Sequence, residues 1–222
     1  MSSVEHRTCP VVLSAPSGAG KTTIAKALVE RSEDVVFSVS ATTRPAREDE
    51  VDGVDYEFLS EQEFREMIEA GELVEWAEVH GHLYGTSRRT IQSALDDGKF
   101  LILDVDVQGA KLMRERVQDV VLVFVLPPSA VALVGRLRDR GSEGEENLIR
   151  RIQNARGELA QAETFDYIVV NDDLERAIEE VRGIVLAEGR RRDRAIDLSS
   201  GIRQLQDQID RILEEDFDIS RE

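Results

Sequence analysis

The chain has 222 residues, a length typical of one large domain or of a core with small inserts, and 41% of them are hydrophobic, enough for a buried core. Its 45 acidic and 28 basic residues leave a net charge of −17, which disfavours general binding to a nucleic-acid backbone. The single cysteine, Cys9, rules out an intrachain disulfide and suits a reducing compartment, so we expect a cytoplasmic location.

The N-terminus, MSSVEHRTCP, lacks the apolar core of a signal peptide, and no apolar run approaches the length of a membrane span. We therefore expect neither a membrane partner nor, from the charge, a nucleic-acid partner.

Apolar runs alternate with helical patterns along the chain. Residues 11–13 are typical of a strand, and a helix is expected to follow over residues 21–31. The other apolar runs, several of them nearly continuous as in strands buried on both faces, are 35–39, 100–103, 120–126 and 167–170. This alternation predicts an α/β fold, a parallel sheet flanked by helices on both sides.

Two stretches interrupt the alternation. Residues 40–90 carry turn signals and aromatic residues, which predict a small inserted α+β lobe whose core includes Phe58 and Trp76. Residues 136–158 are densely charged around Gly-Ser-Glu-Gly and predict a mobile lid between two helices. The core domain would then comprise residues 1–39, 91–135 and 159–197, and residues 198–222 would form a C-terminal tail.

The stretch APSGAGKT lies between the first predicted strand and the first predicted helix, the context that a P-loop requires. Glycines let backbone N–H groups converge on an anion, and the helix N-terminus adds its positive dipole end. A chance glycine-rich turn is the alternative, and the accompanying strand, helix, lysine and threonine argue against it. Alanine stands where the pattern begins with glycine, a mild departure. The residues expected to bind a nucleoside triphosphate here are Ala15, Pro16, Ser17, Gly18, Ala19, Gly20, Lys21, Thr22 and Thr23.

An apolar run that ends in Asp104 predicts the carboxylate that completes a Mg²⁺ site with Thr22. Asp106 follows two residues later, so both carboxylates leave the same face of an extended chain. Capping of the strand end is the alternative role for the pair. Together the two motifs predict a P-loop NTPase-type sheet, without identifying the acceptor of the phosphate.

The predicted lobe and the strand end beside it carry side chains that suit a second phosphate site and a base. Arginines provide forked donors, tyrosines provide short hydroxyl bonds, and carboxylates can accept from the N–H groups of guanine. A solvated basic edge is the alternative for the arginines. The members of this set are Ser40, Arg44, Arg47, Tyr56, Glu75, Tyr84, Thr86 and Asp106.

In these segments the sequence resembles the guanylate kinases. Matching segments run in order from about residue 10 to residue 190, and include LSAPSGAGKTT, SVSATTRPAREDEVDGVDYEF, ELVEWAEVHGHLYGTS, ILDVDVQGA and IVVNDDLERA. The arginine and tyrosine cluster with its downstream Tyr-Gly-Thr is far more specific than the P-loop. The resemblance implies a P-loop kinase with a GMP-binding lobe and a helical lid, which uses MgATP to convert GMP, and dGMP as a second acceptor, to the diphosphate.

The resemblance also implies roles for single residues. Guanine would be read by Ser40, Glu75, Thr86 and Asp106, and the GMP phosphate would be held by Arg44, Arg47, Tyr56 and Tyr84. Mg²⁺ would be held by Thr22 and Asp104, and Asn171 and Asp172 would lie near adenine. The catalytic residues would be Lys21, Arg47, Arg140 and Arg151, of which the last two would swing from the lid over the γ-phosphoryl group.

Two other functions are compatible with parts of this sequence. One is a guanylate-kinase-like module that binds proteins and has lost catalysis, which the intact Gly18, Gly20 and Lys21 argue against. The other is a kinase for a different nucleoside monophosphate, which a substrate panel would separate.

The tail carries apolar residues at alternating spacings of four and three, as in a short heptad pattern. These residues are Leu198, Ile202, Leu205, Ile209 and Ile212. An amphipathic helix docked on its own subunit, a homodimer contact and a frayed segment are the alternatives. The acidic end, EEDFDISRE, is expected to be disordered.

Overall fold

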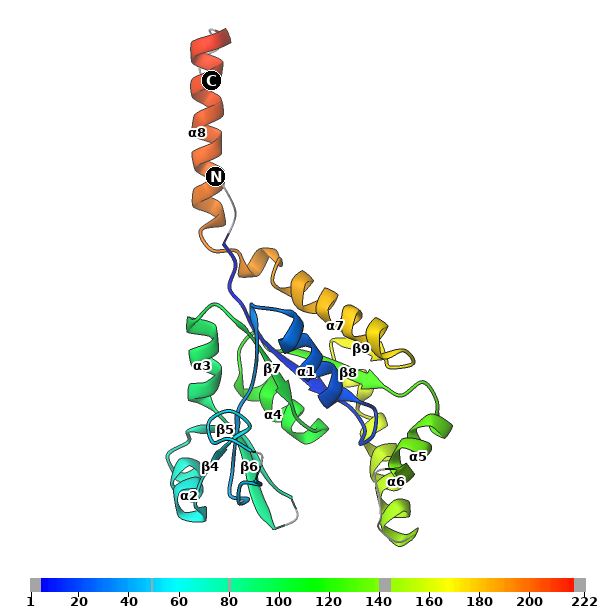
Figure 1. Cartoon of the computed structure of the whole chain (residues 1–222). Coiled ribbons are helices and arrows are strands. Elements are labelled where there is room, and N and C mark those ends of the chain that lie inside the picture. Colours follow the sequence, from blue (N-terminus) through cyan, green and yellow to red (C-terminus); the bar gives the residue numbers. More distant parts are fainter. Residues whose placement is uncertain (1–4, 49, 80, 140–144, 218–222) are drawn as a thin grey trace.

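The structure is a computed structural model that describes residues 5–48, 50–79, 81–139 and 145–217 (Figure 1). The predicted parallel sheet is confirmed, with strand order β2-β7-β1-β8-β9. Four of its strands match the predicted runs closely, whereas β2 ends earlier than the predicted residue 39. The strands are β1 (Pro10–Ser14), β2 (Val35–Phe37), β7 (Phe100–Asp104), β8 (Val121–Leu126) and β9 (Tyr167–Val170).

Helices cover both faces of this sheet because its strands are apolar on both sides. In β1, Val11 and Leu13 pack toward α1 (Lys21–Arg31) and α7 (Leu174–Glu188). Val12, between them, belongs to the opposite core with residues of α3 (Arg88–Asp96) and α4 (Val107–Arg116). Successive side chains of a strand point to opposite faces, so a run of apolar residues supplies two cores.

The inserted lobe is a second sheet with strand order β4-β3-β6-β5 and one helix. Phe64 of the helix is fully buried in a small core with residues of β3, β5 and β6, and Ser60 and Glu63 form a capping box at its start. Trp76 is 43% exposed, so its assignment to the lobe core is wrong: it lies on the outer face of β5. The elements are β3 (Ser40–Thr42), β4 (Tyr56–Phe58), α2 (Glu61–Glu69), β5 (Leu73–Val79) and β6 (His82–Ser87).

The segment predicted to form the lid consists of helices α5 (Ala130–Asp139) and α6 (Glu145–Leu159). The predicted boundary at residue 136 falls inside α5, since Leu133 and Leu137 of this helix pack with Ala155 of α6. Arg140 lies outside the described residues. Two short 3₁₀ turns, η1 (Ala162–Thr164) and η2 (Arg192–Arg194), flank β9 and α7.

The tail forms one long helix, α8 (Leu198–Phe217), which projects from the end of the body opposite the lid and the lobe (Figure 1). The expectation of disorder from Glu214 onward is wrong as far as Phe217, because the helix continues to that residue. Within the described residues, no helix is both long enough and apolar enough to cross a membrane.

Candidate active site

The P-loop connects the end of β1 to the start of α1, as the sequence predicts. Gly18 and Gly20 have φ angles of 87° and 95°, in the left-handed region that favours glycine. A Cβ atom on Gly20 would lie 2.5 Å from Nδ2 of Asn171. Both backbone strain and lack of space therefore require glycine at this position.

Asn171, the residue that follows β9, binds the backbone of the P-loop. Its side-chain Nδ2 donates a 2.7 Å hydrogen bond to the carbonyl of Ala19, and the residue is 5% exposed. Arg136 of the lid donates from Nη1 to the same carbonyl, at 3.3 Å, and from Nη2 to the carbonyl of Asn171, at 3.4 Å. Asn171 thus contacts the loop itself, whereas the exposed Asp172 beside it pairs with Arg176. The sequence had indicated Arg136 only as a member of the densely charged stretch 136–158.

Asp104, the last residue of β7, contacts the side chains of two P-loop residues. The Lys21 ammonium forms an ion pair with one carboxylate oxygen of Asp104, and the Thr22 hydroxyl donates to the other. Parallel pairing of β1 with β7 places Asp104 beside Leu13, one residue before the end of β1. A hydroxyl and a carboxylate are suitable protein ligands for Mg²⁺, which takes its remaining oxygens from phosphates and water. The predicted metal-binding pair is therefore assembled.

Three of the predicted guanine-reading residues meet where β5 passes the start of α4. Glu75 is 8% exposed, and its Oε1 accepts a 2.7 Å hydrogen bond from the Thr86 hydroxyl. Asp106 caps α4 and accepts from the Gly109 N–H at 2.7 Å, and Oε2 of Glu75 lies 3.3 Å from the position of a Cβ on Gly109. Burial raises the pKa of Glu75, and the nearby charge of Asp106 adds to this shift. Ser40, the fourth, lies on β3 at the register of Tyr56.

The predicted phosphate-binding residues of the lobe gather around Arg44. Its guanidinium lies 5.3 Å from the ring centroid of Tyr56, whose ring lies 6.1 Å from that of Tyr84. Arg44 binds both carboxylate oxygens of Glu50, at 2.8 and 2.9 Å, and Glu50 also accepts from the Arg47 backbone N–H. These bonds lower the pKa of Glu50 to about 2. Glu50 thus occupies the guanidinium N–H donors of Arg44 that a bound phosphate would use. The sequence did not indicate this contact, although Glu50 lies only three residues after Arg47.

The lid also contacts the P-loop through Glu158. Its Oε2 accepts a 3.3 Å hydrogen bond from the backbone N–H of Ser17, and burial raises the pKa of this carboxyl. Arg151 donates to the Leu137 carbonyl at 3.2 Å and so faces α5. No sequence motif pointed to Glu158, because 141 residues separate it from Ser17.

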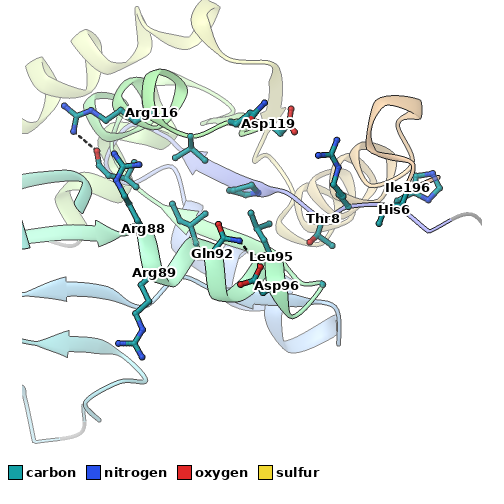
Figure 2. A pocket seen from close by; sticks show the side chains of 17 residues that line it. His6, Thr8, Arg88, Arg89, Gln92, Leu95, Asp96, Arg116, Asp119 and Ile196 are labelled. Atoms are coloured by element: carbon teal, nitrogen blue, oxygen red, sulfur yellow. Dashed lines mark hydrogen bonds between the residues drawn. The ribbon is translucent and has the colours of Figure 1, made fainter. Parts of the chain in front are cut away.

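A cavity of about 890 Å³ lies away from this site, along α3 between the N-terminal segment and the end of α4. Figure 2 shows Arg88 and Arg116 near each other toward one end of it, and His6 and Ile196 at the other. None of the predicted site residues lines it. The candidate active site lies instead where the P-loop, the lobe and the helices of the predicted lid approach one another, at Asp104, Asp106 and Glu158.

Comparison with known proteins gives a consistent result. A family model described as guanylate kinase matches residues 7–188. A guanylate kinase from Thermotoga maritima is 49% identical over 80% of this chain and 86% of its own, and one from Caldanaerobacter subterraneus subsp. tengcongensis is 44% identical over 91% and 98%. The crystal structure of guanylate kinase from Anaplasma phagocytophilum is similar with a TM-score of 0.71 and 33% identity, over 98% of this chain and 99% of that one.

Proposed function

The chain belongs to the guanylate kinase family, whose enzymes transfer a phosphoryl group from ATP to GMP, and we propose that the two nucleotides meet at the carboxyl end of β7. One observation supports this most directly. Asp104, at the end of β7, binds Lys21 and Thr22 of the P-loop, whereas Asp106, two residues later, lies beside Glu75 of the lobe. A single short segment therefore joins the proposed ATP and GMP sites.

On the ATP side, the backbone N–H groups of the P-loop and the N-terminus of α1 would hold the phosphates. Lys21 would exchange its ion pair with Asp104 for contact with the β- and γ-phosphates. Thr22 and Asp104 would hold Mg²⁺, which supplies positive charge to the phosphate oxygens when bound. Asn171 and Arg136 would keep the loop in shape through the Ala19 carbonyl, so we assign Asn171 a positioning role.

On the GMP side, Glu75 and Asp106 would accept hydrogen bonds from guanine N–H groups, with Thr86 and Ser40 beside them. The GMP phosphate would bind the arginines and tyrosines of the lobe: Arg44, Arg47, Tyr56 and Tyr84. To do so it must compete with Glu50 for the guanidinium of Arg44. An unligated lobe would thus keep its arginine paired until a phosphate with greater charge arrives.

Phosphoryl transfer to GMP requires little general acid or base catalysis from the protein. The second pKa of a phosphate monoester is about 6, so the attacking oxygen of GMP is already deprotonated at neutral pH. Catalysis then rests on alignment and on positive charge around the transferred group. Lys21 and Arg47 would supply part of that charge, and Arg151 would supply more after leaving the Leu137 carbonyl. Arg140 is proposed for the same role from the sequence resemblance alone.

A substrate panel tests the proposal. Coupled measurement of ADP production with GMP, dGMP, AMP, UMP and CMP should show turnover with GMP and dGMP and little with the other three. GMP binding without turnover would favour the non-catalytic protein-binding module, and turnover with another base would refute the guanine assignments. A cytoplasmic location and the lack of a nucleic-acid partner remain predictions from the sequence.

A further inference from the structure

Helix α8 carries an apolar stripe that stays open to solvent. Ile202, Leu205, Ile209 and Ile212 are 45%, 42%, 55% and 51% exposed. Large aliphatic side chains that line one face of a helix normally pack against a partner surface. An isolated helix is only marginally stable in water, and burial of its apolar face supplies most of its stability. The stripe therefore calls for a partner that the isolated chain does not supply.

The spacing of the stripe is that of a coiled coil. Residues 202 and 209 take the a positions, and residues 198, 205 and 212 take the d positions. Both a positions are isoleucine, and the d positions are leucine at 198 and 205 and isoleucine at 212. Isoleucine at a with leucine at most d positions is closest to the combination that favours two parallel strands. A membrane-binding helix has no need for this four-three alternation.

Residues that flank the stripe suit pairing with an identical helix. The e and g positions beside the seam include the neutral Gln206 and Gln208, so no like charges face each other there, and Glu215 is the exception at the far end. Arg203 and Arg211 occupy outer positions, together with the acidic residues 207, 210 and 214. In a chain with a net charge of −17, this neutral seam is a surface on which two copies can meet without strong repulsion.

The position of α8 leaves room for a second copy. The helix projects from the end of the body opposite the lid and the lobe (Figure 1). Pairing along α8 therefore leaves the proposed nucleotide sites open to substrates.

We propose that α8 pairs with α8 of a second copy of this chain as a parallel two-stranded coiled coil. The seam extends over about two heptads, less than the three to four that support a coiled coil by themselves. The dimer is therefore weak and concentration-dependent, and its two active sites work independently.

Sedimentation equilibrium of the full chain from low to high micromolar concentration tests the proposal. The wild type should pass from monomer to dimer, whereas Ile209→Glu should remain monomeric throughout and keep its kinase activity. Gln204→Glu adds the same charge at an outer position of α8, and should dimerise like the wild type. Because residue 209 is 55% exposed and outside the core, the substitution should not affect folding, which circular dichroism checks.

Cross-linking tests the orientation. In a parallel pair the two a positions face each other, so Ile209→Cys should form an intermolecular disulfide with an added thiol oxidant, and Gln204→Cys should form far less. Cys9 is 1% exposed, and burial raises its pKa to about 11, so it should stay unreactive in both variants.

Several results would overturn the proposal: a wild type that is monomeric at every concentration, a dimer that survives Ile209→Glu, or equal cross-linking of the two cysteine variants. Strong amide-exchange protection of α8 in a monomer would show instead that the helix folds back on its own body. The cavity of Figure 2, whose lining includes Ile196 next to α8, would then be the surface to examine. Kinase activity is measured separately in every case, so its loss would count against the proposed function and not against the dimer.

Discussion

Replacing Glu75 by glutamine should separate the contribution of this carboxylate to guanine binding from the cost of burying its charge. The substitution keeps the size of the side chain and keeps an oxygen that can accept from the Thr86 hydroxyl. It removes a negative charge that burial and Asp106 both disfavour, as the raised pKa of Glu75 shows. A purely structural role would therefore be preserved or improved, and only a role in binding would be lost.

The magnitude for GMP follows from the hydrogen bonds that would be lost. A hydrogen bond to a charged group contributes about 1.5–3 kcal/mol, so the KM for GMP should rise roughly 10- to 150-fold, with the KM for ATP nearly unchanged. Coupled assays with one nucleotide varied at a time measure both constants. Glu78→Gln, on the same strand but exposed, is the matched control and should leave both values unchanged.

The same substitution should weaken GMP binding but increase the stability of the folded protein at neutral pH. A carboxyl whose pKa is raised by folding contributes stability below its ordinary pKa, and that contribution is lost as the pH rises through the raised value. The Tm of Glu75→Gln should therefore exceed that of the wild type at neutral pH, and the difference should shrink toward acid. GMP binding should tighten with rising pH in the wild type over the same window, since the ionised carboxylate accepts the base. An unchanged KM for GMP, or a variant with a lower Tm at neutral pH, would refute this reasoning.

Four further outcomes are expected. Lys21→Ala should abolish nearly all turnover while calorimetry shows GMP binding mostly intact, because this lysine belongs to the ATP side; wild-type turnover would contradict that assignment. Gly20→Ala should lower both Tm and ATP affinity, since its φ of 95° is strained for alanine and its Cβ would lie 2.5 Å from Asn171, whereas Gly183→Ala, in a helix with open space, should be tolerated. Arg151→Ala should lower kcat and kcat/KM together with little effect on GMP affinity, as expected for a contact made mainly in the transition state, and an effect confined to GMP affinity would place this arginine in the acceptor site. Truncation after Ser200 should keep kinase activity within a few-fold and leave a monomer by light scattering; a folded but inactive product would show that the tail reaches the active site.

The sequence by itself determined the elements that depend on neighbours along the chain. The P-loop, the helix that begins at Lys21 and the strand that ends in Asp104 all follow from local spacing, because periodicity and glycine placement act over a few residues. Local spacing also located the strands along the chain, but it could not give the order in which they lie in the sheet.

Only the tertiary structure decided which distant side chains meet. Asn171 reaches Ala19 across 152 residues, and Glu158 reaches Ser17 across 141. Such contacts leave no periodic trace, since each depends on how β1, β9 and the lid helices are placed side by side. The same holds for α8: its heptad spacing is visible in the sequence, but the alternatives of docking and pairing could be weighed only once the helix was seen to leave the body with its stripe exposed. Local spacing determines what a segment can form, and packing determines what it touches.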